Sequence, residues 1–565
     1  MPTEFRTLAE LCEKLEGTSK RLLMRDLAAD FLKRLEADEV EPAVSMILGR
    51  AFPKWDQRVL EVSWATLSGV IKRLTDVDWK DFREAFSSTG DVGAATKIVF
   101  EKAGKVQKQA MLFEKPLTIL EVRRRLEAIA ETIGYGSRER KERLLETLLG
   151  EATPLEVKYL VKILIGEMRT GFFEGMMELA VSEAFQIPLD VVQRAGMFAG
   201  DVAEVAAVAK VKGKEGVLSL RFQLFRPIRL MMAQMAVDVG EALKEHGGES
   251  AFEYKLDGAR IQIHKLGDEV KVYSRRLTDV TESLPEVVQL IRDQIRASEA
   301  ILEGEVIAVG EDRSPMLFQH LMRRFRRVHD VEDMTKRIPI ELYLFDLLYL
   351  DGLSLINNTY VERRRKLEEI SGNIPLTHQL ITTNSKEAER FLEEAINRGH
   401  EGLMAKKIDS PYTPGIRGKR WFKIKKTLEP LDLVIVAAEW GYGRRHEWLS
   451  DYYLAARDSE TGELLMVGKT FKGLTDEEII QMTKRLKELA IKEEHGRVVV
   501  VPKVVVEVAY NEIQKSPKYK CEMALRFARI TRIRDDKSPE EADTIQKVKE
   551  IYEKQFEKKA IPHAI

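Results

Sequence analysis

The sequence predicts a multidomain α+β protein with an all-helical N-terminal domain, a mixed α/β domain in the middle and a C-terminal β-barrel of the OB type. A helical period of apolar residues persists from Thr7 to about Lys210. Short β-rich runs then alternate with helices between Phe252 and Lys426, and strand-like runs dominate beyond Glu429. The length of 565 residues agrees with about three or four domains.

The helical domain is expected over residues 1–215. Apolar residues recur at helical spacing in VRRRLEAIAETI and in RKERLLETLLGEATPLEVKYLVKILIGEMRTGF, and Gly and Pro mark the breaks between helices. This pattern ends after Gly213, which places the first domain boundary near residue 215.

Two further domains are expected over residues 216–428 and 429–565. In the first, SLPEVVQLIRDQIRAS and SKEAERFLEEAINRG have the period of helices that separate β-rich runs. In the second, strand-like runs predominate and DEEIIQMTKRLKELA is the expected helix; these runs are LDLVIVAAEWGYG, DYYLAARD, LLMVGKTFKG and RVVVVPKVVVEVAYNEIQ.

The composition excludes several classes of protein. The chain has only two cysteines, Cys12 and Cys521, a charged amphipathic N-terminus and no apolar run long enough to span a membrane. These features argue against a disulfide scaffold and a membrane protein, and they predict a soluble cytoplasmic protein. The formal net charge is −1, from 91 basic and 92 acidic residues, so a site for a polyanion requires local segregation of charge.

The octapeptide EYKLDGAR at residues 253–260 is the first candidate site. It places Lys255 two residues before an Asp-Gly turn, between flanks rich in aromatic and β-branched residues. Taken alone, the segment is explained equally well by an ordinary hairpin that carries a surface lysine.

Five further segments follow in the same domain, each at an expected strand end. They are YSRR with Arg275, ILEGEVIAV with Glu305, YLFDLLYLDG with Phe345, EGLMAKK with Glu401, and RWFKIKK with Lys423 and Lys425. Each alone has an ordinary explanation, such as a paired buried carboxylate for Glu305 or an amphipathic strand for FKIKK. All six segments in this order within one domain are not expected by chance.

With these motifs the chain resembles an ATP-dependent DNA ligase of the archaeal type, related in its core to eukaryotic replicative ligases. The family's KxDGxR signature is matched by Lys255, Asp257, Gly258 and Arg260. The segment RFARITRIRDDKSPEEA resembles the motif of the family's barrel, and IGEMRTGF and RPIRLMMAQM resemble its helical DNA-binding domain and the following junction. The resemblance implies that the three domains are a DNA-binding domain, an adenylation (nucleotidyltransferase) domain and an OB-fold domain.

The resemblance also implies roles for individual residues. Lys255 would be the nucleophile that forms a lysyl-AMP intermediate, and Glu253 and Phe345 would hold the adenine. Glu305 would contact the ribose and, with Glu401, would bind Mg²⁺, for which Mn²⁺ is an alternative. Contacts to sugar or phosphate are implied for Arg260, Arg275, Arg417, Lys423 and Lys425, and contacts to the departing pyrophosphate for Arg534 and Lys537.

The chemistry of lysine agrees with this assignment. An amine attacks phosphorus only when it is neutral, and the ordinary pKa of lysine is about 10.4. Clustered cations and a divalent metal depress such a pKa. We therefore expect Arg260, Arg275, Lys423 and Lys425, together with a divalent metal, to lower the pKa of Lys255.

One segment imitates another nucleotide-binding motif. GELLMVGKT at residues 462–470 resembles a Walker loop, but five residues separate Gly462 from Gly468 where the motif requires four. No helix is expected directly after Thr470, as a phosphate-binding loop requires. A hairpin is expected here, and ATP is expected to bind without a P-loop.

Local charge predicts where this neutral chain binds nicked double-stranded DNA. From Gln514 to Lys537 there are eight basic residues against three acidic ones, a local net charge of +5. A second basic cluster, LMRRFRRVHD at residues 321–330, is explained somewhat better as a solvated helix face than as a DNA contact. Three domains on one chain could encircle a duplex as a monomer and contact its phosphates without reading sequence.

The segment QKQAMLFEKP at residues 107–116 suggests a protein partner. Gln109 to Phe113 resemble the peptide with which archaeal ligases bind the sliding clamp, although a loop that packs Phe113 into its own domain is an equal alternative. For the whole chain, the alternatives are an RNA ligase or capping-type nucleotidyltransferase, which share KxDGxR, and an inactive ligase-like scaffold. The intact Lys255, Glu305, Glu401 and Lys425 argue against the scaffold.

Overall fold

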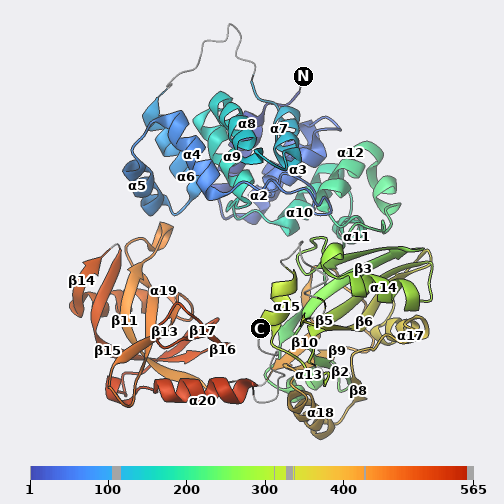
Figure 1. The fold of residues 1–565 in the computed structure, drawn as a ribbon. Coiled ribbons are helices and arrows are strands. Elements are labelled where there is room, and N and C mark those ends of the chain that lie inside the picture. Colours follow the sequence, from blue (N-terminus) through green and yellow to red (C-terminus); the bar gives the residue numbers. More distant parts are fainter. Residues whose placement is uncertain are drawn as a thin grey trace.

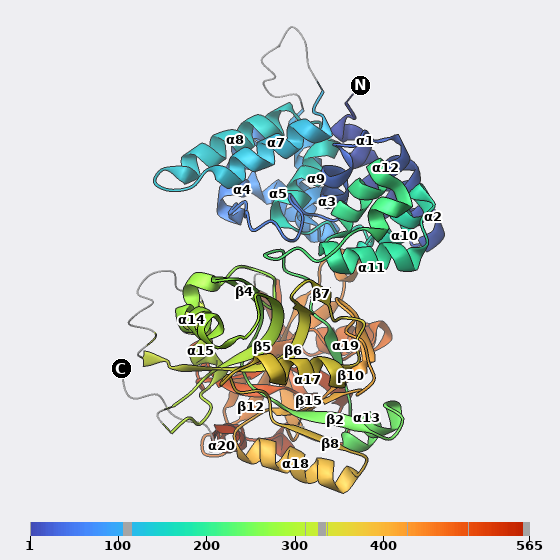
Figure 2. The same ribbon diagram turned by 90° about the vertical axis from the view of Figure 1, so that its right-hand side faces the viewer.

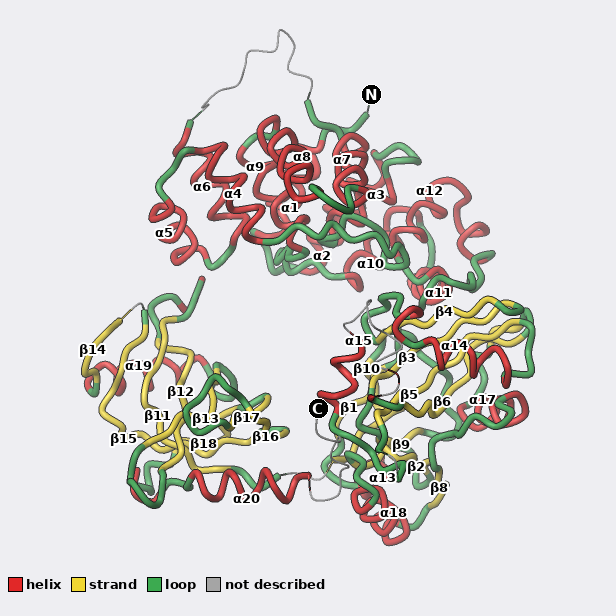
Figure 3. Tube along the Cα trace, in the orientation of Figure 1, coloured by secondary structure: helices red, strands yellow, loops and turns green. Residues whose placement is uncertain are grey.

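A computed structural model describes residues 2–104, 116–310, 312–325, 335, 337–425, 428–494 and 496–556. Figure 1 shows three bodies that follow one another along the chain: a helical body at the top, a body with two sheets at the lower right and a strand-rich body at the lower left. Figure 3 shows helices in all three bodies, whereas the labelled strands lie in the middle and C-terminal bodies. In the part of the chain described, no helix has the length and apolar character needed to span a bilayer.

The helical body is built around α9, whose entire length packs into the core. Its N-terminus is fixed by a capping box between Thr153 and Glu156 with Pro154 in the first turn, and Gly166 ends it in a left-handed conformation. The helices are α1 (Phe5–Glu16), α2 (Arg21–Arg34), α3 (Val40–Ile47), α4 (Trp64–Thr75), α5 (Trp79–Thr89), α6 (Val92–Ala103), α7 (Ile119–Glu131), α8 (Ser137–Glu151), α9 (Pro154–Ile165), α10 (Glu174–Phe185), α11 (Leu189–Ala199) and α12 (Val202–Leu218).

A linker joins the helical body to the middle body. Helix α12 is interrupted at Gly213, whose φ is 57°. The chain beyond residue 218 then runs along β3 (Ala259–Leu266), a strand of the middle body. The backbone N–H of Phe225 donates to Nδ1 of His264 at 3.0 Å, and the N–H of Ile228 donates to Oε1 of Gln262 at 2.8 Å. Buried side chains of that strand therefore fix the path of the linker.

The middle body contains two five-stranded sheets. The first has the order β1-β10-β9-β2-β8 and the second the order β4-β3-β5-β6-β7. The strands are β1 (Met232–Met235), β2 (Ser250–Lys255), β3 (Ala259–Leu266), β4 (Glu269–Ser274), β5 (Glu299–Ala308), β6 (Ile340–Leu350), β7 (Leu353–Ser354), β8 (Gln379–Thr382), β9 (Gly402–Lys406) and β10 (Arg417–Lys425), and the helices are α13 (Val239–Glu245), α14 (Pro285–Gln294), α15 (Phe318–Phe325), α17 (Tyr360–Ile370) and α18 (Ser385–Asn397). Figure 2 shows α14 beside the second sheet and α18 beside the first.

The segment EYKLDGAR does not form a hairpin. Strand β2 belongs to the first sheet and β3 to the second, so the Asp-Gly turn carries the chain from one sheet to the other. The expected strands on both sides of the turn are present, but they do not pair with each other. Lys255 is therefore the last residue of a strand at the junction of two sheets, not a surface residue of a simple ribbon.

The C-terminal body is rich in strands, as expected. Its main sheet has the order β13-β12-β11-β15-β14 with β18 paired along β15, and the pairings in the described part of the chain do not close it into a barrel. The elements are β11 (Leu431–Trp440), β12 (Leu449–Arg457), β13 (Leu464–Thr470), α19 (Asp476–Glu488), β14 (Ala490–Glu494), β15 (Arg497–Ala509), β16 (Glu512–Lys515), β17 (Met523–Arg526), β18 (Arg529–Ile533) and α20 (Ile545–Phe556). Strand β13 pairs antiparallel with β12, so GELLMVGKT lies in a hairpin and not in a phosphate-binding loop.

Backbone contact joins the C-terminal body to the helical body. A Cβ on Gly90, the C-cap of α5, would lie 2.5 Å from the backbone nitrogen of Gly443. The rings of Phe86 and Tyr442 lie 5.5 Å apart beside this contact. Two glycines thus allow the two bodies to approach through their backbones.

Candidate active site

Lys255 lies at the end of β2, beside the ends of β9 and β10. Its Nζ is 2.5 Å from Oε2 of Glu401, and Nζ of Lys425 is 2.6 Å from the same oxygen. Both lysines are paired with Gly402 across the sheet. Gly402 has a φ of 144°, and a Cβ there would lie 2.1 Å from the carbonyl oxygen of Ile424. Only glycine fits this position, and it allows both lysines to meet at one carboxylate.

The Asp-Gly turn brings the second sheet to this cluster. A Cβ on Gly258 would lie 2.3 Å from the carbonyl oxygen of Val306 in β5, so the close approach of the two segments requires glycine. Directly after the turn, Arg260 pairs with Glu305 across β3 and β5. Glu305 is thereby placed near enough to Lys255 for its charge to raise the pKa of the lysine.

The carboxylates dominate the electrostatics of the cluster. Burial raises the pKa of Glu305 to about 7, and the negative charge of Glu401 adds to this effect. Burial alone would lower the pKa of Lys255, but Glu401 and Glu305 outweigh it, and the pKa is raised. Among the protein's own groups, the carboxylate that contacts the ammonium therefore outweighs the clustered cations, and a lower pKa of Lys255 in the presence of a divalent metal stays a prediction.

Positive charge from both sheets lies beside the cluster. Burial lowers the pKa of Lys423, and four neighbouring cations lower it further: Lys425, Lys255, Arg417 and Arg275. Arg417 begins β10 in the first sheet, whereas Arg275 follows β4 of the second, and both side chains are exposed. The predicted basic residues therefore converge on one region, which is suited to a polyphosphate.

Glu253 and Phe345, the two residues expected to hold the base, contact a common lysine. Glu253 lies two residues before Lys255, on the same face of β2. Nζ of Lys406 is 2.7 Å from Oε2 of Glu253 and 4.7 Å from the ring centre of Phe345 in β6. Burial lowers the pKa of Lys406, and Glu253 opposes this shift.

Arg260 is engaged by the protein itself. Its Nη1 donates to the carbonyl oxygen of Met231 at 2.7 Å, and its Nη2 donates to Oε2 of Glu303 at 2.7 Å. The hydroxyl of Tyr412 donates to the other oxygen of Glu303 at 2.7 Å. The arginine of the KxDGxR signature thus ties the end of the linker to β5.

The sequence analysis missed three side chains of this region. Lys406 lies within EGLMAKK and Glu303 within ILEGEVIAV, and a charged residue inside an apolar strand is a signal that could have found both. Tyr360, whose hydroxyl donates to Glu253, begins a helix, and the sequence around it offers no comparable signal.

Arg534 and Lys537 contact their own body rather than the Lys255 cluster. Nη1 of Arg534 lies 3.0 Å from both carboxylate oxygens of Asp432, and Nζ of Lys537 lies 2.6 Å from Oδ2 of the same residue. On another edge of the guanidinium, Nη2 of Arg534 lies 2.7 Å from Oδ2 of Asp536. Asp432 is the second residue of β11, so the basic motif is attached to the strand with which the C-terminal body begins.

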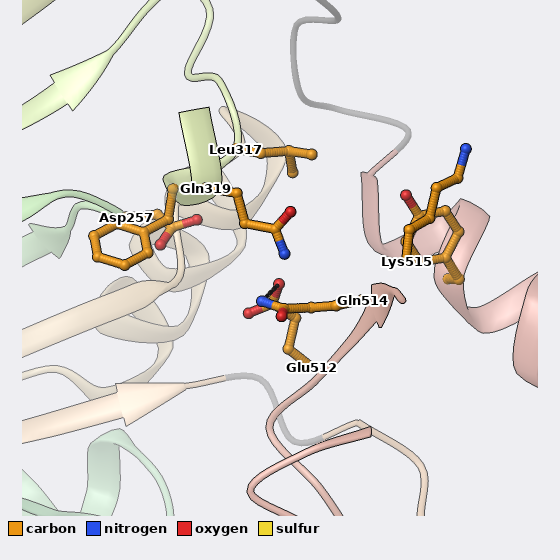
Figure 4. A pocket seen from close by; sticks show the side chains of 8 residues that line it. Asp257, Leu317, Gln319, Glu512, Gln514 and Lys515 are labelled. Atoms are coloured by element: carbon orange, nitrogen blue, oxygen red, sulfur yellow. Dashed lines mark hydrogen bonds between the residues drawn. The ribbon is translucent and has the colours of Figure 1, made fainter. Parts of the chain in front are cut away.

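A narrow pocket marks where the C-terminal body faces the middle body. Figure 4 shows Asp257, Leu317 and Gln319 on one side, and Glu512, Gln514 and Lys515 of β16 on the other. The C-terminal body thus lines this pocket beside Asp257 with residues of β16, and neither Arg534 nor Lys537 is among the lining residues.

The carboxylates of Glu305 and Glu401 are the candidate ligands of a metal ion. The described residues contain no group of three or more His, Cys, Asp or Glu side chains arranged to hold a metal ion. Glu305 and Glu401 nevertheless lie close enough for one to raise the pKa of the other. Mg²⁺ commonly uses one or two carboxylates together with phosphate oxygens. The pair therefore fits such an ion when a polyphosphate supplies the other ligands.

Comparisons with known proteins agree with this geometry. The chain matches the family models described as DNA ligase N terminus over residues 4–182, ATP dependent DNA ligase domain over 230–425 and ATP dependent DNA ligase C terminal region over 445–537. It is 46% identical to the DNA ligase of Thermococcus fumicolans, with 97% of this chain and 98% of the relative covered. It is 48% identical to DNA ligase 1 of Korarchaeum cryptofilum, with 98% and 99% covered.

A solved structure shows the same fold over most of the chain. The structure titled Pmar-Lig_PreS3 is 16% identical, has a TM-score of 0.57, and covers 93% of this chain and 99% of its own. The ordered family matches and the nearly full-length relatives together show that this chain belongs to the family of ATP-dependent DNA ligases.

Proposed function

We propose that this ligase seals nicks in duplex DNA through a covalent AMP carried on Lys255. Nζ of Lys255 attacks the α-phosphorus of ATP, so that an N–P bond forms, the bond to the bridging oxygen breaks and pyrophosphate leaves. The 5′-phosphate of the nick then takes the AMP, and the 3′-hydroxyl displaces it to form the phosphodiester bond. The observation that carries this proposal is the meeting of Lys255, Glu401 and Lys425 across three strands, beside Glu305.

The attack requires Lys255 to lose a proton. Glu401 stabilises that proton on Nζ, since the carboxylate lies 2.5 Å away. A divalent cation, Mg²⁺ or Mn²⁺, held by Glu305 and Glu401 would supply positive charge that weakens this hold. Glu305 lies on β5, so the second sheet would help to set the charge state of a lysine on the first.

The cations around Lys255 would bind the sugar and phosphates. We assign Lys423 and Lys425 to the phosphates, since Lys425 already lies beside the nucleophile and Lys423 is surrounded by positive charge. Arg275 and Arg417 would approach from the exposed rim. Arg260 would act closer to the base, because its guanidinium lies 5.3 Å from the ring centre of Phe345.

The basic motif of the C-terminal body would act only in the first step. Arg534 and Lys537 are held together by Asp432, and we propose that they move to the triphosphate and orient the departing pyrophosphate. In the structure they contact Asp432, so we propose that the C-terminal body changes its position relative to the middle body to bring them to the triphosphate.

The partner of the enzyme would be nicked double-stranded DNA. The basic residues between Gln514 and Lys537 and the helical body would contact its phosphates without reading bases. We expect a monomer that works on DNA in the cytoplasm. The clamp-binding segment, Gln109 to Phe113, lies outside the described residues, and its partner stays a proposal.

Intact-mass analysis tests the proposal. The chain should gain the mass of AMP on incubation with ATP and Mg²⁺, and should lose it when a nicked duplex is added. If the chain gains AMP, keeps it when nicked DNA is added and loses it when nicked RNA is added, the protein is instead an RNA ligase. No gain of mass would contradict the covalent mechanism.

A further inference from the structure

We propose that Lys406 is a positioning residue that holds Glu253 as a hydrogen-bond acceptor, and that this makes the site select adenine over purines that carry a carbonyl at the six position. The proposal rests on the proposed function, in which Glu253 contacts the base. It assigns a role to a buried lysine that the proposed reaction does not otherwise use.

Lys406 is a buried cation inside an aromatic box. Its side chain is 1% exposed, and its Nζ lies 4.7, 4.8 and 4.7 Å from the ring centres of Phe345, Tyr360 and Trp421. The same Nζ lies 2.7 Å from Oε2 of Glu253. Three π-faces stabilise an ammonium where water cannot, and the carboxylate supplies the opposite charge.

The second oxygen of Glu253 is also held by donors. The amide of Gln379 donates to the hydroxyl oxygen of Tyr360 at 2.5 Å, so the hydrogen of that hydroxyl is directed to Oε1 of Glu253. Nη1 of Arg364 adds positive charge at 3.8 Å from the same oxygen. The groups that contact Glu253 are therefore donors, and they fix the carboxylate as an acceptor.

An acceptor held in this way distinguishes purines by their six position. A carboxylate has about four acceptor sites, so it can accept one more hydrogen bond from the amine of adenine. Hypoxanthine and guanine carry a carbonyl oxygen there, and two acceptors that face each other leave both without a partner. Sites built for a hydrogen bond discriminate strongly against analogues that cannot make it.

The lysine also connects the two halves of the proposed base site. Nζ donates to the carbonyl oxygen of Phe345 at 3.4 Å, in addition to lying over its ring. Phe345 belongs to β6 of the second sheet and Glu253 to β2 of the first. One side chain on β9 thus sets the position of both the ring that would stack on the base and the carboxylate that would read its edge.

The test compares ATP with inosine triphosphate, which carries a carbonyl in place of the amine at the six position. The rate of covalent nucleotide gain is measured with each triphosphate for the wild type, Lys406→Met, Tyr360→Phe and Glu253→Gln. Lys407→Met serves as the matched control, because Lys407 is the next residue and pairs with Asp409 outside the base site. The wild type should prefer ATP by at least about tenfold.

We expect Lys406→Met to lower this preference about tenfold, mainly through a higher KM for ATP, and Lys407→Met to leave it unchanged. Tyr360→Phe removes a single hydroxyl and should lower the preference in the same direction but by less. A Lys406→Met variant that keeps the wild-type preference while Glu253→Gln loses it would overturn the role of Lys406.

Two controls separate misfolding and failure of the proposed function from failure of this inference. Each variant should keep its cooperative unfolding transition, and the Lys407→Met control should also keep its sealing of a nick that already carries AMP. If Lys406→Met does not fold, Tyr360→Phe decides, and an unchanged preference there overturns the proposal. If no variant alters the preference, Glu253 does not read the base. If the wild type gains no AMP at all, the proposed function itself is wrong.

Discussion

Nζ of Lys255 and Oε2 of Glu401 lie 2.5 Å apart, where the end of β2 runs beside β9. The pair identifies one amine and one carboxylate as the centre of the site, and it couples them to Lys425 through the same oxygen. Changes at this centre and at the residues that shape it give predictions that can be checked separately.

Lys255→Ala should abolish the covalent adenylate, because it removes the only atom proposed to attack ATP. Binding to nicked duplex should be largely retained, since the proposed DNA contacts lie mostly in other parts of the chain. Intact mass and a gel-shift assay measure the two properties. Gain of AMP at a different lysine in the variant would show that the nucleophile is assigned wrongly.

Gly402→Ala should disrupt the centre without touching any charged group. A Cβ at this position would meet the carbonyl oxygen of Ile424 at 2.1 Å, and the φ of 144° is strained for alanine. We expect at least a tenfold loss of adenylation and about 2–4 kcal/mol less stability toward unfolding.

The matched control for this variant is Gly418→Ala. Gly418 lies on the neighbouring strand β10, where a new Cβ would lie 3.9 Å from Cγ2 of Ile416, an ordinary van der Waals contact. The control should keep both activity and stability in denaturant titrations. Equal behaviour of the two variants would show that the close approach at Gly402 does not matter.

Arg534→Ala and Lys537→Ala should each lose self-adenylation severely and still seal a nick that already carries AMP. Their charges are proposed to matter only while a triphosphate is bound. Loss of one charge-assisted contact to a phosphate should slow self-adenylation about ten- to a hundredfold.

Lys520→Ala provides the control for these two variants, because Lys520 is an exposed lysine of the same body that pairs with Glu463. It should adenylate normally. If Arg534→Ala and Lys537→Ala also fail on the pre-adenylated nick, the two residues serve DNA binding or the sealing step instead.

Because His264 is buried, we expect the free energy of unfolding to fall in mild acid. Burial lowers its pKa to about 3, whereas an exposed histidine titrates near about 6.5. Between these values the unfolded chain binds a proton that the folded chain does not. The contribution of neutral His264 to the free energy of unfolding is therefore fully present above about pH 6.5 and is lost as the pH falls toward 3. Protonation would also displace the N–H of Phe225 from Nδ1.

His264→Asn removes this titration and should flatten the pH dependence. Between pH 7.5 and pH 5 the wild type should lose about 2 kcal/mol more unfolding free energy than the variant. Urea titrations at the two pH values measure the difference. The exposed His446→Asn variant should follow the wild type, and a His264→Asn variant that does the same would contradict the assignment.

The proposed clamp segment can be examined by pull-down with the cognate sliding clamp. A Leu112→Ala, Phe113→Ala double variant should be retained much less than the wild type, because it removes the apolar plug. Equal retention would leave packing within the chain's own helical domain as the role of this segment.

The motifs predicted the centre of the site but not its electrostatics. Lys255, Glu401 and Lys425 come together because they lie at the ends of three neighbouring strands, and strand ends can be recognised from sequence. The direction of the Lys255 pKa could not be predicted, because it depends on which charge touches the ammonium. Counting cations along the sequence left out the direct contact with Glu401.

The topology of the sheets was the second feature that could not be predicted from the sequence. A turn between two strand-like runs suggested a hairpin at EYKLDGAR, since nothing local shows which sheet each strand joins. The aromatic box around Lys406 combines β6, β9, β10 and the start of α17, and no single segment reveals it. For the same reason the motif with Arg534 and Lys537 was recognised, whereas its attachment to Asp432 was not.

The Asp-Gly crossing between the two sheets makes adenylation depend on the folding of both sheets. Lys255 and Glu253 belong to one sheet, Glu305 and Phe345 to the other, and the crossing keeps the two sets in register. Under the proposed mechanism, a chain in which either sheet is unfolded lacks part of the site and cannot charge itself with AMP. The fraction of a preparation that accepts AMP therefore counts the molecules in which both sheets are folded, and adenylation doubles as an assay of correct folding.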